Sequence, residues 1–172
     1  MIAFCFALAT SSVVQIYNHE PRHSIYISMS KFSYQLVTGG VELQQAFEVR
    51  RQVFVREQSI SEDLVFDGHD RESLHIVAKD GQRVIGSTRV QLLTDKRAKL
   101  ERMAILRHYR RKGVGKGMLL FLDTVWKDKQ VQQVIIHAQL EVVPFYKLYG
   151  FDEFGLPFQE AGIKHIKMCK QV

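Results

Sequence analysis

Short stretches in which apolar and polar residues alternate recur along this sequence, as they do in half-buried β-strands. The first clear stretch, 32–37, alternates in this way and carries Phe, Tyr and Val. Further strands are predicted at 74–78, 83–92, 99–106, 131–137, 151–154 and 164–170. An Asp-Gly pair at 80–81 separates two of them and predicts a hairpin.

Three other stretches repeat apolar residues every three or four positions, which is typical of helices packed on a core. They are 41–57, 113–127 and 142–149, and Gly150 ends the third. Residues 59–70 are polar and acidic, which predicts a short helix or a loop. The order of the elements predicts one mixed sheet with helices on its faces, an α/β or α+β fold.

Composition and charge limit the classes of function. A chain of 172 residues with 46% hydrophobic and 24% charged residues fits one ordinary globular domain. The net charge of +6 and a pI of about 9.4 favour an anionic partner. Apart from 107–116 the basic residues are dispersed, which fits one local anion site better than a nucleic-acid track. Only Cys5 and Cys169 occur, so a reducing compartment, the cytoplasm, is expected rather than a disulfide framework.

The N-terminal residues differ from the rest. An apolar run at 2–9 resembles the core of a signal peptide, but no positive residue precedes it. It is also too short to span a bilayer. A second start-like sequence begins at Met29, so we predict that 1–30 form a poorly ordered extension and 31–172 the domain.

A basic, glycine-rich turn, RRKGVGKG from Arg110 to Gly117, joins the strand predicted at 99–106 to the helix predicted at 113–127. Free N–H groups and the helix dipole make a helix N-terminus an anion site. Glycines let the backbone approach a phosphate, and Arg and Lys supply counter-charge. The turn therefore predicts a phosphate-binding site.

Three known phosphate-binding patterns can be compared with this turn. A Walker loop needs Ser or Thr where Gly117 stands, and a dinucleotide loop needs Gly where Met118 stands. The third pattern, Gln/Arg-x-x-Gly-x-Gly/Ala, is matched throughout by 110–115. It is the pyrophosphate loop of the GNAT acyl-CoA N-acyltransferases. A basic helix start is the alternative interpretation of an isolated match.

A second motif, PFYKLYGF from Pro144 to Phe151, is similar to the Phe-Tyr-x-x-x-Gly-Phe segment after the fifth strand of GNAT enzymes. With both motifs in this order, the chain resembles the GNAT superfamily over roughly residues 31–170. Three further segments resemble its ElaA/YjcF-like branch: RRQVFVREQ (50–58), FDGHD (66–70) and AGIKHIKM (161–168).

The resemblance implies a mostly antiparallel sheet of about six to seven strands, with helices on both faces. It also implies that the strands at 99–106 and 131–137 splay apart around acetyl-CoA. Backbone groups of one strand would pair with the pantetheine arm, and the amides of 111–116 would hold the pyrophosphate. The implied cofactor-binding residues are Met103, Ala104, Ile105, Arg110, Arg111, Lys112, Gly113, Val114, Gly115, Lys116, Gln139 and Tyr146. Gln139 departs from the Asn that many members carry.

The resemblance also gives Tyr146 the role of the acid that reprotonates the leaving thiolate, with Tyr149 as the rival. The residues predicted to be catalytic are Tyr146, His75 and Glu57. His75 is the preferred base among the candidates His69, His75, His137 and His165, and a structural histidine is its alternative. Asp67 and Asp70 are further carboxylates that face the substrate or cap structure. No histidine shows zinc-ligand spacing, so no metal is expected.

The expected function is N-acetyl transfer from acetyl-CoA by direct attack of an amine on the thioester. One alternative is a CoA-binding regulatory domain without turnover, and another is a basic nucleic-acid-binding module. Acetyl-CoA and an amine are the expected partners, with no nucleic acid and no membrane. The sequence leaves open the acceptor amine and whether the chain forms a homodimer.

Overall fold

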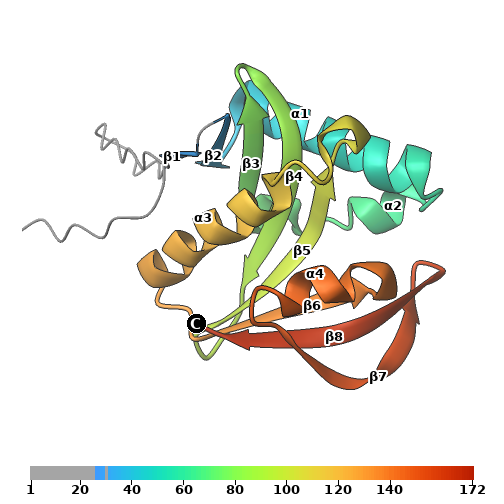
Figure 1. Ribbon diagram of the computed structural model, residues 1–172. Coiled ribbons are helices and arrows are strands. Elements are labelled where there is room, and N and C mark those ends of the chain that lie inside the picture. The colour runs from blue at the N-terminus through green and yellow to red at the C-terminus, as the bar shows by residue number, and fades with distance from the viewer. Residues whose placement is uncertain (1–25, 30) are drawn as a thin grey trace, which may run out of the picture.

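One mixed sheet organises the computed structural model, which describes residues 26–29 and 31–172. Its order is β1-β2-β3-β4-β5-β6-β8-β7, and only the β5–β6 pair is parallel (Figure 1). The strands are β1 (Tyr26–Met29), β2 (Phe32–Val37), β3 (Leu74–Asp80), β4 (Arg83–Leu92), β5 (Arg97–Ile105), β6 (Gln133–Gln139), β7 (Asp152–Glu160) and β8 (Ile163–Gln171). Of the predicted extension 1–30, only 26–29 are described, and they pair with β2; the rest lies outside the described residues.

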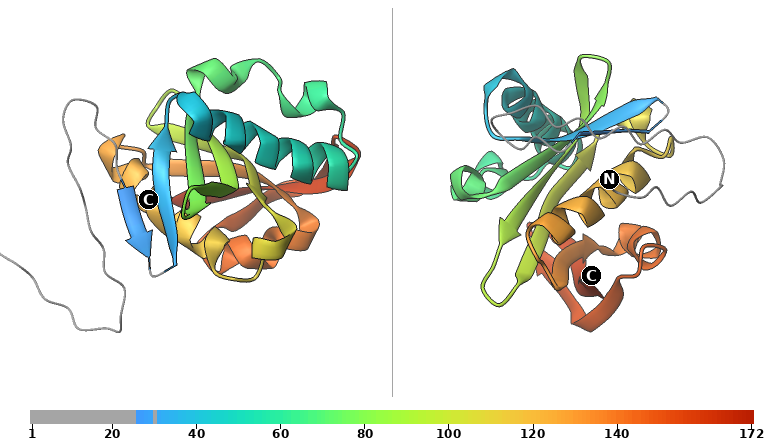
Figure 2. Two further views of the ribbon diagram at one scale, coloured as in Figure 1. Left: turned by 90° about the horizontal axis from the view of Figure 1, so that it is seen from above. Right: turned by 90° about the vertical axis from the view of Figure 1, so that its left-hand side faces the viewer.

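Helices cover both faces of the sheet, with α1 on one and α3 on the other (Figure 2). The helical elements are α1 (Gly40–Arg50), η1 (Arg51–Glu57), α2 (Glu62–Val65), η2 (His69–Glu72), η3 (Arg107–Tyr109), α3 (Val114–Asp128), η4 (Leu140–Val142) and α4 (Val143–Lys147). The predicted fold class is confirmed. In the part of the chain that the structure describes, no helix is long and apolar enough to cross a bilayer.

Two hydrophobic cores result, one on each face of the sheet. On the α3 face, Met118, Phe121 and Leu122 are at most 1% exposed and pack on the sheet. On the α1 face, Ala46 and Val49 pack among apolar strand residues. Burying a large apolar side chain contributes about 1.5–3 kcal/mol, so these two layers hold the helices on the sheet.

Three elements differ from their predicted form. The helix predicted at 41–57 turns π-helical from Arg51 onward, and the one predicted at 142–149 is a 3₁₀ turn followed by the short α4. β7 extends to Glu160 instead of ending at Phe154. It tolerates the intervening glycine and proline because it is an edge strand with a register shift between Phe154 and Phe158.

The splayed strand pair predicted near the centre of the sheet is present. β5 and β6 pair only from Arg97↔Gln133 to Leu100↔Ile136, and both strands continue beyond that point. β5 also bulges there, because its register against β4 shifts and Arg102 takes a positive φ of 52°. A bulge bends its strand, so it turns the end of β5 away from β6 and opens a space between them.

Candidate active site

The basic turn leads from η3 into α3 as the sequence predicts. Gly113 caps the helix with φ 83°, a conformation that favours glycine, and its carbonyl accepts the N–H of Gly117 at 2.9 Å. The side chains of Arg111, Lys112 and Lys116 are exposed around this helix end. Free N–H groups, the helix dipole and three cations are the features that favour anion binding at a helix N-terminus.

The other two glycines of the turn are also packing positions. A Cβ at Gly115 would lie 3.1 Å from the Phe145 ring and 3.3 Å from Ile105 Cδ1. A Cβ at Gly117 would fall on the Tyr34 side chain, whose ring packs directly against α3. Close packing selects glycine at Gly115 and Gly117, and the motif also needs glycine or alanine at position 115. The sequence alone does not separate packing from phosphate binding as the reason.

Arg110 lies at the junction of three elements. Its Nε donates to the carbonyl oxygen of Ile105 at 2.9 Å, and its Nη2 lies 2.6 Å from the Glu57 carboxylate. The structure thus brings two predicted site residues together, but as an ion pair. Arg110 ties the end of η1 to the end of β5, and Glu57 is occupied by that contact.

Tyr146 reaches across the opening between the strands. It is 8% exposed on α4, and its hydroxyl lies 3.4 Å from the sulfur of Met103 on β5. The rings of Phe145 and Phe151 hold it edge-on, with centroids 5.2 and 5.6 Å away. Burial raises the pKa of the Tyr146 hydroxyl, so this group is a protonated donor at neutral pH.

Tyr149, the rival tyrosine, lies on the outer side of this aromatic cluster. Its ring is half-buried and packs on Phe145 with a centroid distance of 5.1 Å. Within residues 31–172, its hydroxyl makes no hydrogen bond. Of the two hydroxyls, that of Tyr146 is the one within hydrogen-bonding distance of a β5 side chain in the described chain.

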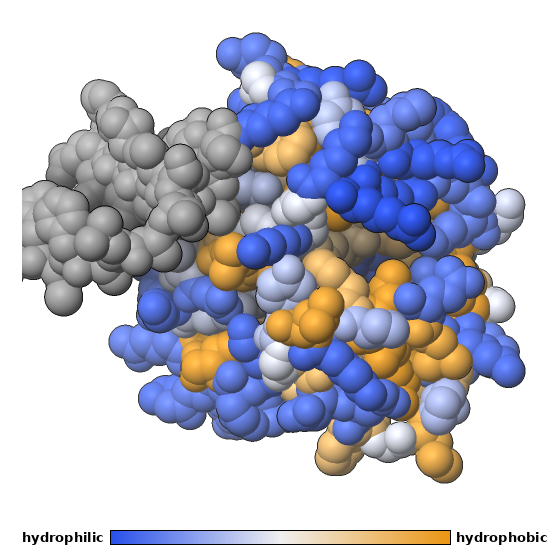
Figure 3. Space-filling model, in the orientation of Figure 1, coloured by the Kyte–Doolittle hydropathy of each residue, from blue (hydrophilic) through white to orange (hydrophobic). Residues whose placement is uncertain are grey.

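The end of β5 offers a backbone edge with no neighbouring strand on its β6 side. Ala104 is 2% exposed and points into the α1-face core, whereas Met103 and Ile105 pack against the α3-face core. Beyond Leu100 the described chain provides no β6 partner for this edge. In Figure 3 the surface is hollowed beside α4, with hydrophilic residues above and apolar residues below.

Gln139 does not stand free at the end of β6. Its side-chain amide and that of Gln58 exchange two hydrogen bonds, of 3.1 and 3.3 Å. The pair joins the residue after η1 to β6 across the splayed strands. A contact between Gln139 and any ligand competes with this amide pair.

His75, the preferred base, is a core residue on the α1 face of the sheet. It is 2% exposed, and its Nε2 lies 2.8 Å from the Asp70 carbonyl oxygen. Its Nδ1 is buried without a hydrogen-bond partner in the described structure, and burial lowers its pKa. β4 separates β3 from β5, so the structure does not bring His75 together with Tyr146.

The FDGHD segment carries a buried charge network next to His75. Arg89 is fully buried and binds Asp67 through two hydrogen bonds, of 2.6 and 2.8 Å, and Glu101 at 2.8 Å. Hydrogen bonds from Arg89 lower the pKa of the Asp67 carboxyl. Arg50 is likewise buried and pairs with Asp70 at 2.6 Å. Asp67 and Asp70 thus neutralise buried arginines, which is the structural role given above as the alternative to facing the substrate.

A cluster that the predicted site omits lies on β6, β7 and β8. His137 Nδ1 is 2.7 Å from the Glu160 carboxylate. The Phe158 ring lies between His137 and His165, with centroids 4.9 and 6.1 Å away. Alternation along β6 places the His137 side chain on the face opposite the buried Ile136. Glu160 lies in a stretch that the sequence predicts to be a loop between two strands, so the sequence could not reveal the His137–Glu160 pair.

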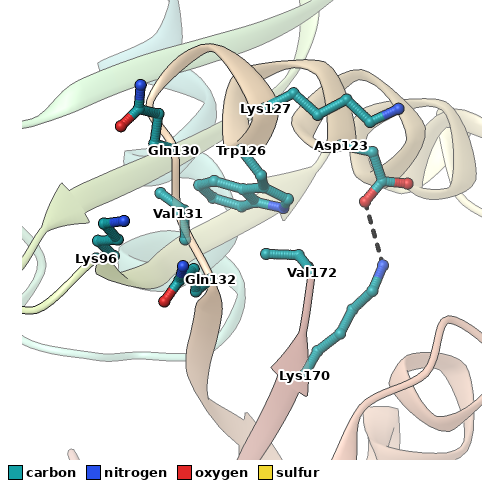
Figure 4. Close-up of a pocket in the computed structure, with 9 residues that line it drawn as sticks. All are labelled: Lys96, Asp123, Trp126, Lys127, Gln130, Val131, Gln132, Lys170 and Val172. Atoms are coloured by element: carbon teal, nitrogen blue, oxygen red, sulfur yellow. Dashed lines mark hydrogen bonds and ion pairs between the residues drawn. The ribbon is translucent and has the colours of Figure 1, made fainter.

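Two further observations concern the rest of the described chain. Among residues 26–29 and 31–172, no group of three His, Cys, Asp or Glu could hold a metal ion. A cavity of about 570 Å³ opens around Trp126 at the C-terminal end of α3, beside the Lys170–Asp123 pair (Figure 4). It lies at the opposite end of that helix from the basic turn and contains none of the predicted site residues.

Comparison with known proteins identifies relatives of this structure. The family model described as "Acetyltransferase (GNAT) domain" matches residues 32–172. The uncharacterized N-acetyltransferase YjcF of Bacillus subtilis is 37% identical over 130 residues, which cover 75% of this chain and 92% of YjcF.

Two solved structures share the fold at lower identity. Escherichia coli ElaA has a TM-score of 0.72 and 22% identity, covering 81% of this chain and 99% of its own. A GNAT family acetyltransferase of Elizabethkingia anophelis, solved with acetyl-CoA bound, has a TM-score of 0.67 and 15% identity, covering 83% of this chain and 99% of its own. The resemblance predicted from the two motifs is confirmed.

Proposed function

The chain belongs to the GNAT family of acetyltransferases, and from this premise we propose that it transfers an acetyl group from acetyl-CoA to an amine. The support is one juxtaposition: the basic N-terminus of α3 adjoins the unpaired edge of β5, and the Tyr146 hydroxyl lies against that edge at Met103. The basic helix end would hold the anionic part of acetyl-CoA, the edge of β5 would pair with its arm, and the Tyr146 hydroxyl would supply a proton.

The residues present fit acetyl-CoA. Its pyrophosphate would bind the free amides of 113–116, with Arg111, Lys112 and Lys116 as counter-charges. Its pantetheine arm would extend the sheet along Met103 and Ala104, whose β6-facing edge has no strand partner in the described chain. The bound acetyl-CoA of the Elizabethkingia relative supports this choice of cosubstrate.

Bound acetyl-CoA supplies an activated acetyl thioester, and the chain supplies position and protons. A backbone N–H of β5 near Met103 would stabilise the negative charge on the carbonyl oxygen during attack. Tyr146 would donate its proton to the sulfur as the carbon–sulfur bond breaks. A free thiol has a pKa of about 8.5 and tyrosine about 10, so this transfer needs a poorly solvated thiolate, which the surrounding aromatic rings favour.

Two of the predicted residues take other roles in this proposal. Arg110 positions the end of β5 through the Ile105 carbonyl and is not assigned to the phosphates. Gln139 would contact the pantetheine arm only if its amide pair with Gln58 parts. We therefore assign the Gln58–Gln139 amide pair to linking the end of η1 to β6.

The test combines binding and turnover. Calorimetry with acetyl-CoA is expected to show stoichiometric binding, and incubation with an amine panel is expected to release thiol and yield an acetylated amine by mass spectrometry. Binding without either product would favour the regulatory, non-catalytic alternative. Absence of acetyl-CoA binding, with salt-dependent binding to DNA instead, would contradict the proposal and favour the nucleic-acid module.

A further inference from the structure

The splayed strands place one residue of each at the entrance of the opening. Leu100 and Ile136 are the last paired residues of β5 and β6. Glu101 and His137 follow them directly, and each points to the α1 side of the sheet, opposite the buried Ile136 core. A general base for the attacking amine must come from groups at this opening, so these two are the candidates that geometry provides.

Glu101 is engaged in ion pairs. Its side chain is 9% exposed, and its two carboxylate oxygens bind Lys99 at 2.7 Å and Arg89 at 2.8 Å. Burial alone would raise the pKa of this carboxyl, but Lys99 and Arg89 outweigh burial and hold it below its usual value. A carboxylate with both oxygens in ion pairs is a weak proton acceptor.

His137 has the opposite arrangement. Its Nδ1 lies 2.7 Å from the Glu160 carboxylate, and the imidazole is 29% exposed. Across residues 31–172, no group hydrogen-bonds its Nε2. A carboxylate at Nδ1 fixes the proton on that nitrogen, which leaves the Nε2 lone pair free to accept a proton.

The surroundings hold this ring in one orientation. Phe158 packs edge-on against His137 and stacks on His165, so the imidazole lies against an aromatic wall. Neighbouring strands present Lys99 and Glu101 from β5, His165 and Lys167 from β8, and Glu160 from β7. The hydrogen bond from His137 lowers the pKa of the Glu160 carboxyl, so the partner of the imidazole is an anion at neutral pH.

We propose that His137, oriented by Glu160, is the general base that accepts the proton of the attacking amine. The assignment rests on the proposed acetyl transfer. As the nitrogen–carbon bond forms, the proton of that nitrogen passes to His137 Nε2. As the carbon–sulfur bond breaks, the Tyr146 proton passes to the sulfur, and solvent then returns the imidazolium proton to Tyr146.

Base and acid therefore act from opposite sides of the sheet. Tyr146 belongs to the α3-face cluster, whereas His137 lies on the α1 side with Gln139. The amine enters along the wall of β6, β8 and β7, and Glu160 is a positioning residue that does not touch it. This arrangement keeps the two proton transfers apart, so that acid and base do not neutralise each other directly.

The first test uses His137→Gln, with His69→Gln as the matched control, because His69 is exposed on η2 and away from β6. Acetyl-CoA affinity by calorimetry is expected to stay unchanged in both. In His137→Gln, kcat/KM for an amine of the panel is expected to fall about 10²–10⁴-fold, while His69→Gln stays near the wild-type rate. If no amine is turned over, the slow hydrolysis of acetyl-CoA is the rate compared. A rate of His137→Gln within threefold of wild type would overturn the assignment.

The second test adds a readout that needs no turnover, so it separates failure of the dyad from failure of the proposed function. Nitrogen-15 NMR of the imidazoles is expected to show His137 protonated on Nδ1 at neutral pH. Glu160→Gln is expected to alter that tautomer and lower kcat/KM, and Glu160→Asp to restore part of the rate. A proton on Nε2 in the wild-type protein would refute the dyad, whatever acetyl-CoA binding shows.

Discussion

Each half of the sheet has an imidazole beside acidic residues, but the two imidazoles differ in burial and in hydrogen bonding. Under α1, His75 is 2% exposed and hydrogen-bonds the Asp70 carbonyl, within a network in which Arg50 and Arg89 neutralise the carboxylates. On the uncovered strands, His137 is partly exposed and keeps one ring nitrogen available. The same residue type thus stabilises the fold in one half and is available for chemistry in the other.

The covering helix explains this difference. α1 removes the β3–β4 half from water, so every charge there must find a partner, and an unpaired one would cost several kcal/mol. Among the described residues, no helix covers the α1 side of β6, β8 and β7, so a half-exposed polar atom there can remain without a hydrogen-bond partner (Figure 2). A perturbed ionisable group therefore indicates function here only where a substrate can reach it.

The largest expected effect comes from the covered half. Asp67→Ala leaves Arg89 fully buried with one carboxylate partner fewer, and this loss should cost about 3–5 kcal/mol of unfolding free energy. Glu160→Ala, on the uncovered half, breaks a partly exposed pair and should cost less than about 1 kcal/mol. Urea denaturation of both variants measures the contrast. Equal losses would mean that the two halves do not differ as described.

The next largest effect is expected on acetyl-CoA affinity, when charge is reversed at one end of α3 or at the other. Lys116→Glu places a negative charge where the pyrophosphate is proposed to bind, and should weaken acetyl-CoA binding about 10–100-fold through loss of a charge-assisted contact. The fold should not suffer, because an acidic residue suits a helix N-terminus. Calorimetry would quantify the affinity.

Lys127→Glu is the matched control, because Lys127 is equally exposed at the C-terminal end of the same helix. It should leave acetyl-CoA affinity unchanged and slightly lower the melting temperature. If both variants weaken acetyl-CoA binding equally, the loss comes from the change in net charge, and the proposed pyrophosphate site at the basic turn is wrong.

A smaller effect is expected at His75. His75→Gln removes the contact to Asp70 and should lower the free energy of unfolding by about 1–3 kcal/mol, while kcat/KM stays within about twofold. Thermal unfolding and steady-state kinetics on the same preparation would show this. A fall of 100-fold in kcat/KM without loss of stability would restore His75 as the base and reverse the comparison.

Local motifs made the basic turn and the helix that carries Tyr146 predictable. The glycines and cations of 110–117 and the Phe-Tyr pair at 145–146 are contiguous in the sequence, and the secondary structure follows their pattern. The family resemblance carried by the two motifs likewise predicted the splayed strands, although the bulge at Arg102 depends on the register of β5 against β4.

Contacts between distant segments could not be predicted. Glu57 and Arg110 are 53 residues apart, and Gln58 and Gln139 are 81 apart. The Gly155 and Pro157 positions favoured a loop, so the extension of β7 to Glu160 was missed, and with it the partner of His137. His75 is 2% exposed and the His137 side chain is 29% exposed, a difference that only the folded chain reveals.

Steady-state kinetics on two tyrosine variants are the most direct test of acetyl transfer with Tyr146 as the acid. Tyr146→Phe removes only the hydroxyl that faces Met103, so acetyl-CoA affinity should hold while kcat falls about 10²–10⁴-fold. Tyr149→Phe alters a hydroxyl without a partner in the described chain and should be nearly silent. Equal, small effects of the two changes would contradict the acid role, and a larger loss from Tyr149→Phe would assign it to the other tyrosine.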